Sequence, residues 1–294
     1  MSIYLTRYHD AGHFLDRAQD FLITHEAEHC LPLGIGTNAR LYPERFHNPS
    51  FSVLEDEGGN IIGTALRTPP HGLVLSLMDE PHQAEAITLI VEEMAAYHGD
   101  LPNVGGPTHL SRAFAEAWSA RTGCTSTRNQ AQRIYRLDAV KPPALVPGQM
   151  RQATAADRDL MIAWLQAFSE EAFPNQTHQI ETTERNIDGM LAMPEVRAYF
   201  LWEVEGEAVC MVGSTGPTPN GIRIGPVYTP PDQRKRGYGS ALTAAVSQHH
   251  LDRGRKHCFL FTDLANPTSN KIYMEIGYVP VVDYDQYVFT AQTQ

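Results

Sequence analysis

The stretch from Ile222 to Ser240 constrains the fold of this chain more than any other part of its sequence. It predicts a β-strand over residues 222–229 and then a turn marked by two prolines and an aspartate at residues 230–232. An amphipathic helix is predicted to begin at the Gly-Tyr-Gly sequence of residues 237–239. This order places a loop and a helix N-terminus directly behind the end of a strand.

The loop before this helix is suited to bind a diphosphate. Gly237 and Gly239 let the backbone adopt positive φ and come close to a ligand. A helix N-terminus presents free N–H groups and the positive end of its dipole. Three consecutive cations, Arg234, Lys235 and Arg236, add charge beside it. We therefore expect an anion site at the carboxyl end of the strand, where ligands of open α/β sheets bind.

Sequences that follow the loop complete a strand–helix–strand unit. The helix stops at Gly254, and a second strand is predicted at His257 to Thr262. Such a unit favours two parallel strands joined by a right-handed crossover. Two other phosphate-binding loops do not match this sequence. A P-loop requires Gly-Lys-Ser/Thr, which is absent, and a dinucleotide-binding fingerprint requires a third glycine and a later acidic residue, which are also missing.

The hexapeptide from Arg234 to Gly239, after a Val-containing strand end, resembles motif A of the GCN5-related N-acetyltransferase (GNAT) superfamily. The sequence from Asn266 to Tyr278 resembles motif B of the same superfamily, with Asn270 and Tyr273 at the matching positions. Both motifs occur in the expected order, and a closing strand from Tyr284 to Thr290 follows them. The C-terminal half is therefore similar to an acetyltransferase domain.

The resemblance implies acetyl-CoA, or another acyl-CoA, as co-substrate, and direct attack of an amine on the thioester without a metal. It implies Tyr273 as the catalytic acid that protonates the leaving thiolate. The backbone N–H of Val227 would stabilise the oxyanion. The implied coenzyme-binding residues are Val227, Tyr228, Thr229, Arg234, Lys235, Arg236, Gly237, Tyr238, Gly239, Ser240, Asn266 and Asn270. Asn266 followed by Pro267 also suits a helix cap.

The general base stays open at this stage. Many family members carry a glutamate on the strand before motif A, whereas this strand offers Arg223 and Tyr228 and no carboxylate. Glu170, Glu171, Glu203 or a water molecule could accept the proton.

The chain divides into two similar halves. A proline-rich linker over residues 141–148 separates a first domain at 1–140 from a catalytic domain at 149–294. Residues 51–78 parallel residues 200–228, with Ile62-Gly63-Thr64 in the place of Val212-Gly213-Ser214. The expected fold class is α/β (α+β): two tandem GNAT-like domains, each with a mixed, mostly antiparallel sheet flanked by helices. The first copy is degenerate, because Asp79 and Glu80 occupy the place of the basic loop and would repel a diphosphate.

Periodicity predicts the remaining elements. In the first half we expect helices at 13–29, 83–98 and 110–122, a hairpin at 51–66, and strands at 72–78 and 131–137. In the second half we expect a strand at 150–153, helices at 160–169 and 181–193, a loop at 170–175, and a hairpin at 197–215.

Charge and cysteine content restrict which binding partners and which cellular compartment are expected. A formal net charge of −11 argues against nucleic acid and favours a cationic acceptor, for which a small-molecule amine is preferred to a protein. Four widely spaced cysteines, without a Cys-x-x-Cys pair, indicate free thiols in a reducing compartment. The sequence shows no membrane span and no secretory signal, so we expect a cytoplasmic protein.

Two alternative functions, a zinc hydrolase and a binding module without turnover, compete with the acetyltransferase hypothesis. His25-Glu26-Ala27-Glu28-His29 matches the His-Glu-x-x-His zinc-hydrolase pattern on a predicted helix, although no third ligand is evident and Pro32 should end that helix. Alternatively, the chain is a tandem module that binds acyl-CoA without turnover, which the missing base on the motif A strand would explain.

Overall fold

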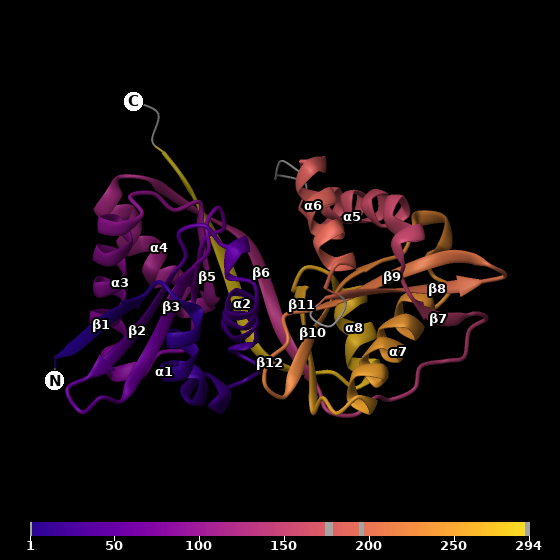
Figure 1. Ribbon diagram of the computed structural model, residues 1–294, viewed down its shortest axis with the longest axis horizontal. Helices are drawn as coiled ribbons and strands as arrows, with labels where there is room; N and C mark the ends of the chain where they lie inside the picture. The colour runs from indigo at the N-terminus through magenta and orange to yellow at the C-terminus, as the bar shows by residue number, and fades with distance from the viewer. Residues whose placement is uncertain (1, 174–178, 194–196, 292–294) are drawn as a thin grey trace. The chain divides into compact units, whose positions relative to one another are not determined.

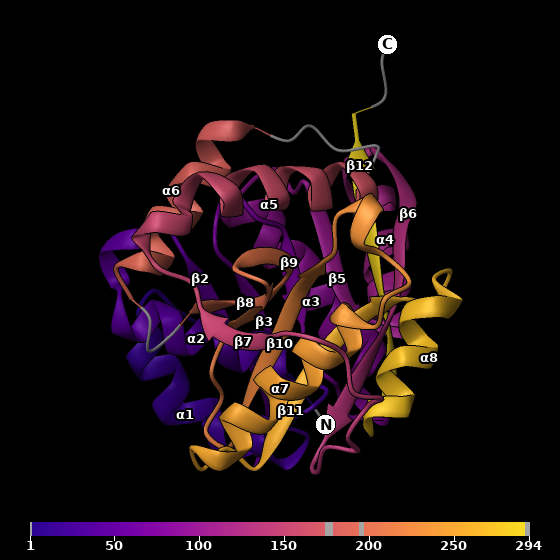
Figure 2. The same ribbon diagram turned by 90° about the vertical axis from the view of Figure 1, so that its right-hand side faces the viewer.

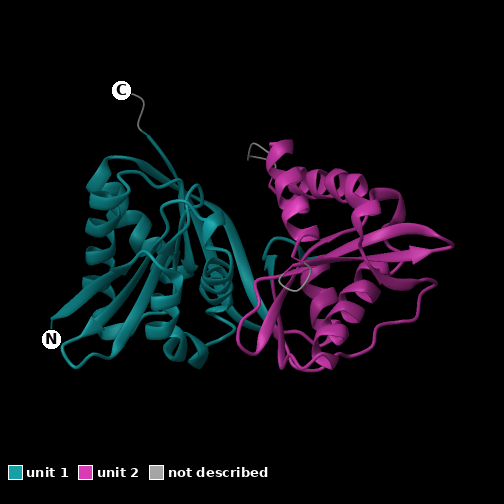
Figure 3. Ribbon diagram, in the orientation of Figure 1, with its two compact units in different colours: residues 1–135, 261–267, 280–294 teal, residues 136–260, 268–279 magenta. Residues whose placement is uncertain are grey.

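The computed structural model describes residues 2–173, 179–193 and 197–291. The chain forms two compact units (Figures 1 and 3). Unit 1 comprises residues 1–135, 261–267 and 280–294, and unit 2 comprises residues 136–260 and 268–279. Among the described residues, no helix has the length and apolar character needed to cross a membrane.

The first half of the chain contains β1 (Ile3–Tyr8), α1 (Ala11–Thr24), α2 (Cys30–Leu41), β2 (Ser50–Asp56), β3 (Ile61–Arg67), β4 (Leu73–Leu75), α3 (Gln83–Tyr97), β5 (Asn103–Pro107), α4 (Thr108–Thr122) and β6 (Thr125–Leu137). The second half contains β7 (Gln149–Gln152), α5 (Arg158–Ala172), α6 (Ile180–Leu191), β8 (Ala198–Val204), β9 (Glu207–Thr215), β10 (Gly221–Tyr228), α7 (Tyr238–Asp252), β11 (His257–Asp263), α8 (Pro267–Ile276) and β12 (Val279–Thr290). Strands and helices thus follow one another in the same order in both halves.

Helices cover both faces of the sheet in unit 1. Along β2, Phe51 and Val53 pack into a core with α1 and α2, while Leu54 packs into a second core with α3 and α4. Alternate residues of a strand point to opposite faces, so both faces need an apolar cover. This explains why β2 has five consecutive buried residues instead of alternating with polar ones.

The sheet of unit 1 runs in the order β1-β2-β3-β4-β5-β12, with β6 next to β12. Neighbours from β1 to β4 are antiparallel, and β4 pairs with β5 in parallel. β12 pairs antiparallel with β5, from Tyr284 opposite Pro107 to Val288 opposite Asn103. The compact units therefore differ from the domains expected at residues 1–140 and 149–294, because the last strand of the chain, β12, belongs to the sheet of unit 1.

Unit 2 repeats this architecture. Its strands run in the order β11-β10-β9-β8-β7, and β10 and β11 are its parallel pair. α5 and α6 lie on one face of this sheet, and α7 and α8 lie on the other (Figures 1 and 2). The expected mixed, mostly antiparallel fold flanked by helices is confirmed.

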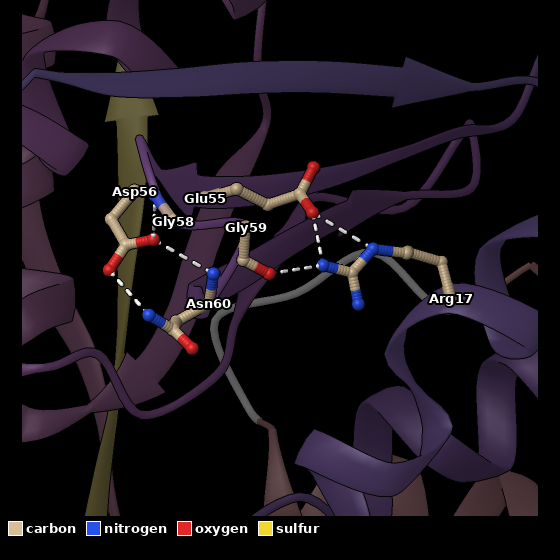
Figure 4. Close-up of polar contacts among 6 residues, drawn as sticks. All are labelled: Arg17, Glu55, Asp56, Gly58, Gly59 and Asn60. Atoms are coloured by element: carbon tan, nitrogen blue, oxygen red, sulfur yellow. Dashed lines mark hydrogen bonds and ion pairs between the residues drawn. The ribbon is translucent and has the colours of Figure 1, made fainter.

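The β2–β3 hairpin illustrates how local sequence sets register (Figure 4). Its turn is closed by Asp56, whose carboxylate accepts hydrogen bonds of 2.8 Å from the Gly58 N–H, from the Asn60 N–H and from the Asn60 amide. These contacts lower the pKa of Asp56, chiefly through the Asn60 side chain. Arg17 of α1 reaches over to bind Glu55 and the Gly59 carbonyl, the latter at 2.6 Å.

Most element predictions are confirmed within a few residues, including the hairpins, α3, α4, α7 and β10. The helix predicted at 13–29 is wrong at its end, because α1 stops at Thr24. α2 was missed, since Pro32 lies in the first turn of this helix, where its missing N–H costs nothing. Glu170 and Glu171 belong to the last turn of α5 and not to a loop. Pro174 and Asn175, the end of that predicted loop, lie outside the described residues.

Candidate active site

A bulge in β10 shapes the centre of the candidate site. β10 pairs with β9 at Ile224 opposite Ser214 and again at Val227 opposite Val212. Two residues of β10, 225 and 226, therefore lie opposite the single residue Gly213. A Cβ on Gly213 would be only 2.7 Å from the Gly225 carbonyl oxygen, so the close approach of the two strands requires glycine there.

β10 also separates from its other neighbour. Its parallel pairing with β11 spans Gly221 to Arg223, opposite His257 to Phe259. Within the described residues, no pairing with β11 continues along the rest of β10. The backbone from the bulge to Tyr228 is thus open to hydrogen bonding on this side, as an extended ligand carrying amide groups requires.

The loop between β10 and α7 reverses the chain through two left-handed residues. Lys235 has φ of 63° and Gly237, the N-cap of α7, has φ of 86°. The first hydrogen bond of the helix runs from the Ala241 N–H to the Gly237 carbonyl at 3.0 Å. The N–H groups of Tyr238, Gly239 and Ser240 precede that bond and lie at the positive end of the helix dipole.

The cations of this loop have different roles. Lys235 and Arg236 are exposed. Arg234 instead folds back: its Nε donates to the Thr229 carbonyl at 2.9 Å, and its Nη2 donates to both carboxylate oxygens of Glu171 at 2.7 Å. The sequence predicted Arg234 as a coenzyme-binding residue and Glu171 as a candidate base, but it did not indicate that the two residues form an ion pair.

Tyr273 of α8 lies near Cys210 of β9. It is 9 % exposed, and burial raises its pKa to about 12, with the nearby Cys210 thiol adding to the shift and a hydrogen bond to Ser269 opposing it. Cys210 in turn accepts a hydrogen bond of 3.2 Å from the Thr229 hydroxyl. Desolvation raises the pKa of Cys210 to about 11, so this thiol is neutral and unsuited to act as a nucleophile.

The glycine loop touches the same group of side chains. A Cβ on Gly239 would lie 3.6 Å from the Thr229 hydroxyl and 3.9 Å from Val227. Thr229, directly after β10, therefore lies beside Gly239 at the start of α7 and donates to Cys210. Cys210 in turn lies near Tyr273, the acid expected on α8. Sequence reasoning missed Cys210, whose lone position in β9 gave no signal.

The other expected residues are placed as follows. The side chains of Tyr228 and Tyr238 are buried, so we expect Tyr238 to contact a ligand through its backbone N–H. Ser240 is half-buried in the first turn of α7. Asn270 lies in α8, three residues before Tyr273, and is half-buried. Asn266 is exposed and directly precedes this helix, as expected of a cap residue, and its N–H donates to the Asp263 carbonyl at 3.1 Å.

Two of the three candidate bases are engaged in ion pairs. Glu171 holds Arg234, and Glu203 of β8 pairs with Arg151 at 3.1 Å. Arg151 also binds both oxygens of Asp157 at 2.8 Å, which lowers the pKa of Asp157 to about 2. Glu170 is exposed, and no ion pair with it occurs among the described residues.

Unit 1 contains the same bulge. Backbone N–H groups of residues 76 and 79 donate to the carbonyls of residues 64 and 62, which leaves Leu77 and Met78 opposite Gly63. In unit 1 a side chain of the same unit occupies the bulge amide, because His29 Nε2 accepts a hydrogen bond of 3.0 Å from the Leu77 N–H. Its Nδ1 donates to the Leu22 carbonyl at 2.9 Å.

The zinc-hydrolase pattern does not form a metal site. Residues 25–29 form a turn after the end of α1, in which the His29 N–H donates to the His25 carbonyl at 2.9 Å and the centroids of the two imidazole rings lie 6.1 Å apart. Both ring nitrogens of His29 are used by backbone groups, and burial lowers its pKa to about 4. Across residues 2–173, 179–193 and 197–291, no group of three or more His, Cys, Asp or Glu side chains could hold a metal ion.

Comparison with known proteins identifies a family match and similar folds. Residues 159–278 match the model of the acetyltransferase (GNAT) family. A tandem GNAT protein from the clavulanic acid biosynthesis pathway has the same fold, with a TM-score of 0.59 at 12 % identity over 100 % of this chain and 99 % of the other.

Two bacterial structures are also similar. A GCN5-related N-acetyltransferase from Sphaerobacter thermophilus has a TM-score of 0.60 at 16 % identity, covering 96 % of this chain and 94 % of its own. A GNAT-family acetyltransferase from Colwellia psychrerythraea has a TM-score of 0.58 at 12 % identity, covering 99 % and 100 %. No sequence among the curated proteins matches this chain.

Proposed function

Starting from a GNAT-family domain at residues 159–278 and a tandem GNAT fold along the chain, we propose that this protein is an acyl-CoA-dependent N-acyltransferase. It transfers an acetyl group from acetyl-CoA directly to an amine, and the C-terminal domain at residues 149–294 carries the reaction. The observation that carries the proposal is the loop ending at Gly237. Its positive φ and the three N–H groups that follow it fit a diphosphate at the end of β10.

The coenzyme would be held along β10 and at the start of α7. The diphosphate would accept hydrogen bonds from the N–H groups of Tyr238, Gly239 and Ser240, with Lys235 and Arg236 as exposed counter-ions. The pantetheine arm would pair with the open backbone of Val227 to Thr229, and Asn266 and Asn270 would contact it from the start of α8.

The reaction would proceed by direct attack. The neutral amine nitrogen adds to the thioester carbonyl carbon, and the oxygen that gains charge is stabilised by the Val227 N–H next to the bulge. The carbon–sulfur bond then breaks, and Tyr273 supplies a proton to the thiolate. A tyrosine whose pKa is raised to about 12 is fully protonated at neutral pH, as this role requires.

Removal of the acceptor's proton remains with Glu170 or with water in this proposal. Glu171 and Glu203 already bind arginine side chains, so their carboxylate oxygens are engaged. No carboxylate of β10 is available, since the strand reads Gly-Ile-Arg-Ile-Gly-Pro-Val-Tyr.

A screen with amine acceptors tests the proposal. Acetyl-CoA is mixed with the protein and a library of small amines, amino acids and peptides, and the free thiol of CoA is followed. We expect thiol release that depends on the acceptor. Calorimetric binding of acetyl-CoA without any acceptor-dependent thiol release would instead support a binding module without turnover.

A further inference from the structure

The guanidinium of Arg234 lies in a site built for a cation. Its Nη2 donates to both carboxylate oxygens of Glu171 at 2.7 Å, and its carbon lies 5.9 Å from the ring centroid of Tyr228. The ring of Trp164 is 6.0 Å from that of Tyr228. A carboxylate beside aromatic rings is the chemistry that recognises ammonium and guanidinium groups.

We propose that Glu171, Tyr228 and Trp164 form a binding site for a cationic group of the acceptor, and that Arg234 occupies it as an internal stand-in while the coenzyme is absent. This inference rests on the proposed function. The acceptor class is an amine that carries a guanidinium or a second ammonium group in addition to the nitrogen that is acylated.

Arg234 is able to leave this site. The side chains of Arg234 and Glu171 are 41 % and 48 % exposed, and an ion pair so open to water is weakly held. Arg234 belongs to the loop in which the diphosphate is expected. A diphosphate carries more negative charge than one carboxylate, so it would draw the guanidinium towards the loop and free Glu171.

The chemistry favours a second, non-reacting cation in this site. A carboxylate beside an ammonium raises the pKa of that ammonium, and a nitrogen that keeps its proton cannot attack a thioester. A guanidinium stays charged at all relevant pH values and is a poor nucleophile. Glu171 can therefore hold such a group while a separate amine of the same molecule reacts.

The site stays anionic and partly apolar after Arg234 leaves. Burial raises the pKa of Tyr228, with the charge of Glu171 adding to the shift and Arg234 opposing it, so the phenol is neutral. The carboxylate is then the remaining charge next to the ring, and the net charge of −11 attracts cations to the whole chain.

Binding of 4-guanidinobutylamine tests the proposal, with 4-ureidobutylamine as an uncharged probe of the same length. Calorimetry without coenzyme compares the wild-type chain with Arg234→Met, in which the internal cation is gone. We expect Arg234→Met to bind the guanidino probe roughly tenfold more tightly than the wild-type chain does, and to ignore the ureido probe. Adding Glu171→Gln should abolish this gain, whereas adding Glu170→Gln, on the same helix, should preserve it.

Coenzyme provides the second arm. Saturating CoA should tighten binding of the guanidino probe to the wild-type chain by a similar factor. The inference is overturned if Arg234→Met gains no affinity, if Glu171→Gln keeps the gain, or if bound CoA has no effect. Failure of CoA itself to bind would refute the proposed function, while the coenzyme-free arm would still decide whether the cation site exists.

Discussion

Tyr273 is the residue on which the proposed acid catalysis depends. Tyr273→Phe keeps the ring packed against Tyr278, at a centroid distance of 6.1 Å, and removes only the hydroxyl. We expect turnover to fall about 10²-fold or more, the range of a lost general acid, with little change in acetyl-CoA affinity. Steady-state kinetics and calorimetry measure the two effects separately, and unchanged turnover would remove the acid role.

Gly237 is the residue on which the diphosphate site depends. Its φ of 86° disfavours any side chain, and a Cβ would lie 2.9 Å from Val146. We expect Gly237→Glu to abolish coenzyme binding in calorimetry, since it adds bulk and negative charge at the anion site.

Gly254 provides the matched control for that variant. It has φ of 92° at the other end of α7, and a Cβ there meets nothing within 4 Å. Gly254→Ala should cost about 1 kcal/mol of stability and leave coenzyme affinity unchanged. Retained binding by Gly237→Glu would refute the loop assignment.

At the scale of elements, His29 joins the end of α1 to the bulge after β4. His29→Leu would leave a partly buried N–H at Leu77 and a buried carbonyl at Leu22 without these partners, so we expect a loss of roughly 2–4 kcal/mol in the free energy of unfolding. Chemical denaturation measures it, and His47→Leu, at an exposed histidine, should be nearly neutral.

His29 also predicts a dependence of stability on pH. Its pKa in the folded chain is lowered to about 4 from an ordinary value of 6.5, mainly by burial. Between these values the unfolded chain binds more protons, so the stabilisation is complete above about pH 6.5 and is lost as pH falls towards 4. In His29→Leu, unfolding free energy should fall less steeply over this range; an identical slope would contradict the assignment.

At the scale of the whole molecule, β12 ties the end of the chain into unit 1. Arg133 binds both oxygens of Asp283 at 2.6 and 3.1 Å, and the buried Asp285 pairs with Arg128 at 3.5 Å. A fragment of residues 1–140 lacks this strand and exposes the edge of β5. We expect it to aggregate or unfold without cooperativity, and to be rescued by fusing residues 279–291 behind a flexible linker. Cooperative unfolding of the fragment alone would show that β12 is dispensable.

The comparison of the two bulges predicts one coenzyme per chain. Unit 1 has Asp79 and Glu80 before α3, and its bulge amide is already bound to His29. Calorimetric titration with CoA should give a stoichiometry near one, and a value near two would show that unit 1 also binds.

Local sequence determined the elements that carry their own signals. The glycine loop, the helix behind it and the Gly-rich hairpin turns were predictable, because positive φ, capping and alternation are properties of neighbouring residues. The internal repeat was also readable, since Gly63 and Gly213 each oppose a bulge where no side chain fits.

Only the tertiary structure decided which distant residues meet. Glu171 and Arg234 are 63 positions apart, and nothing in either segment indicates their ion pair. The sequence also could not show that residues 25–29 leave the helix, that His29 caps a backbone N–H 48 positions away, or that β12 completes the sheet of unit 1. Such contacts depend on how strands and helices pack across long separations, and the hydrophobic pattern of a single segment does not encode its partner.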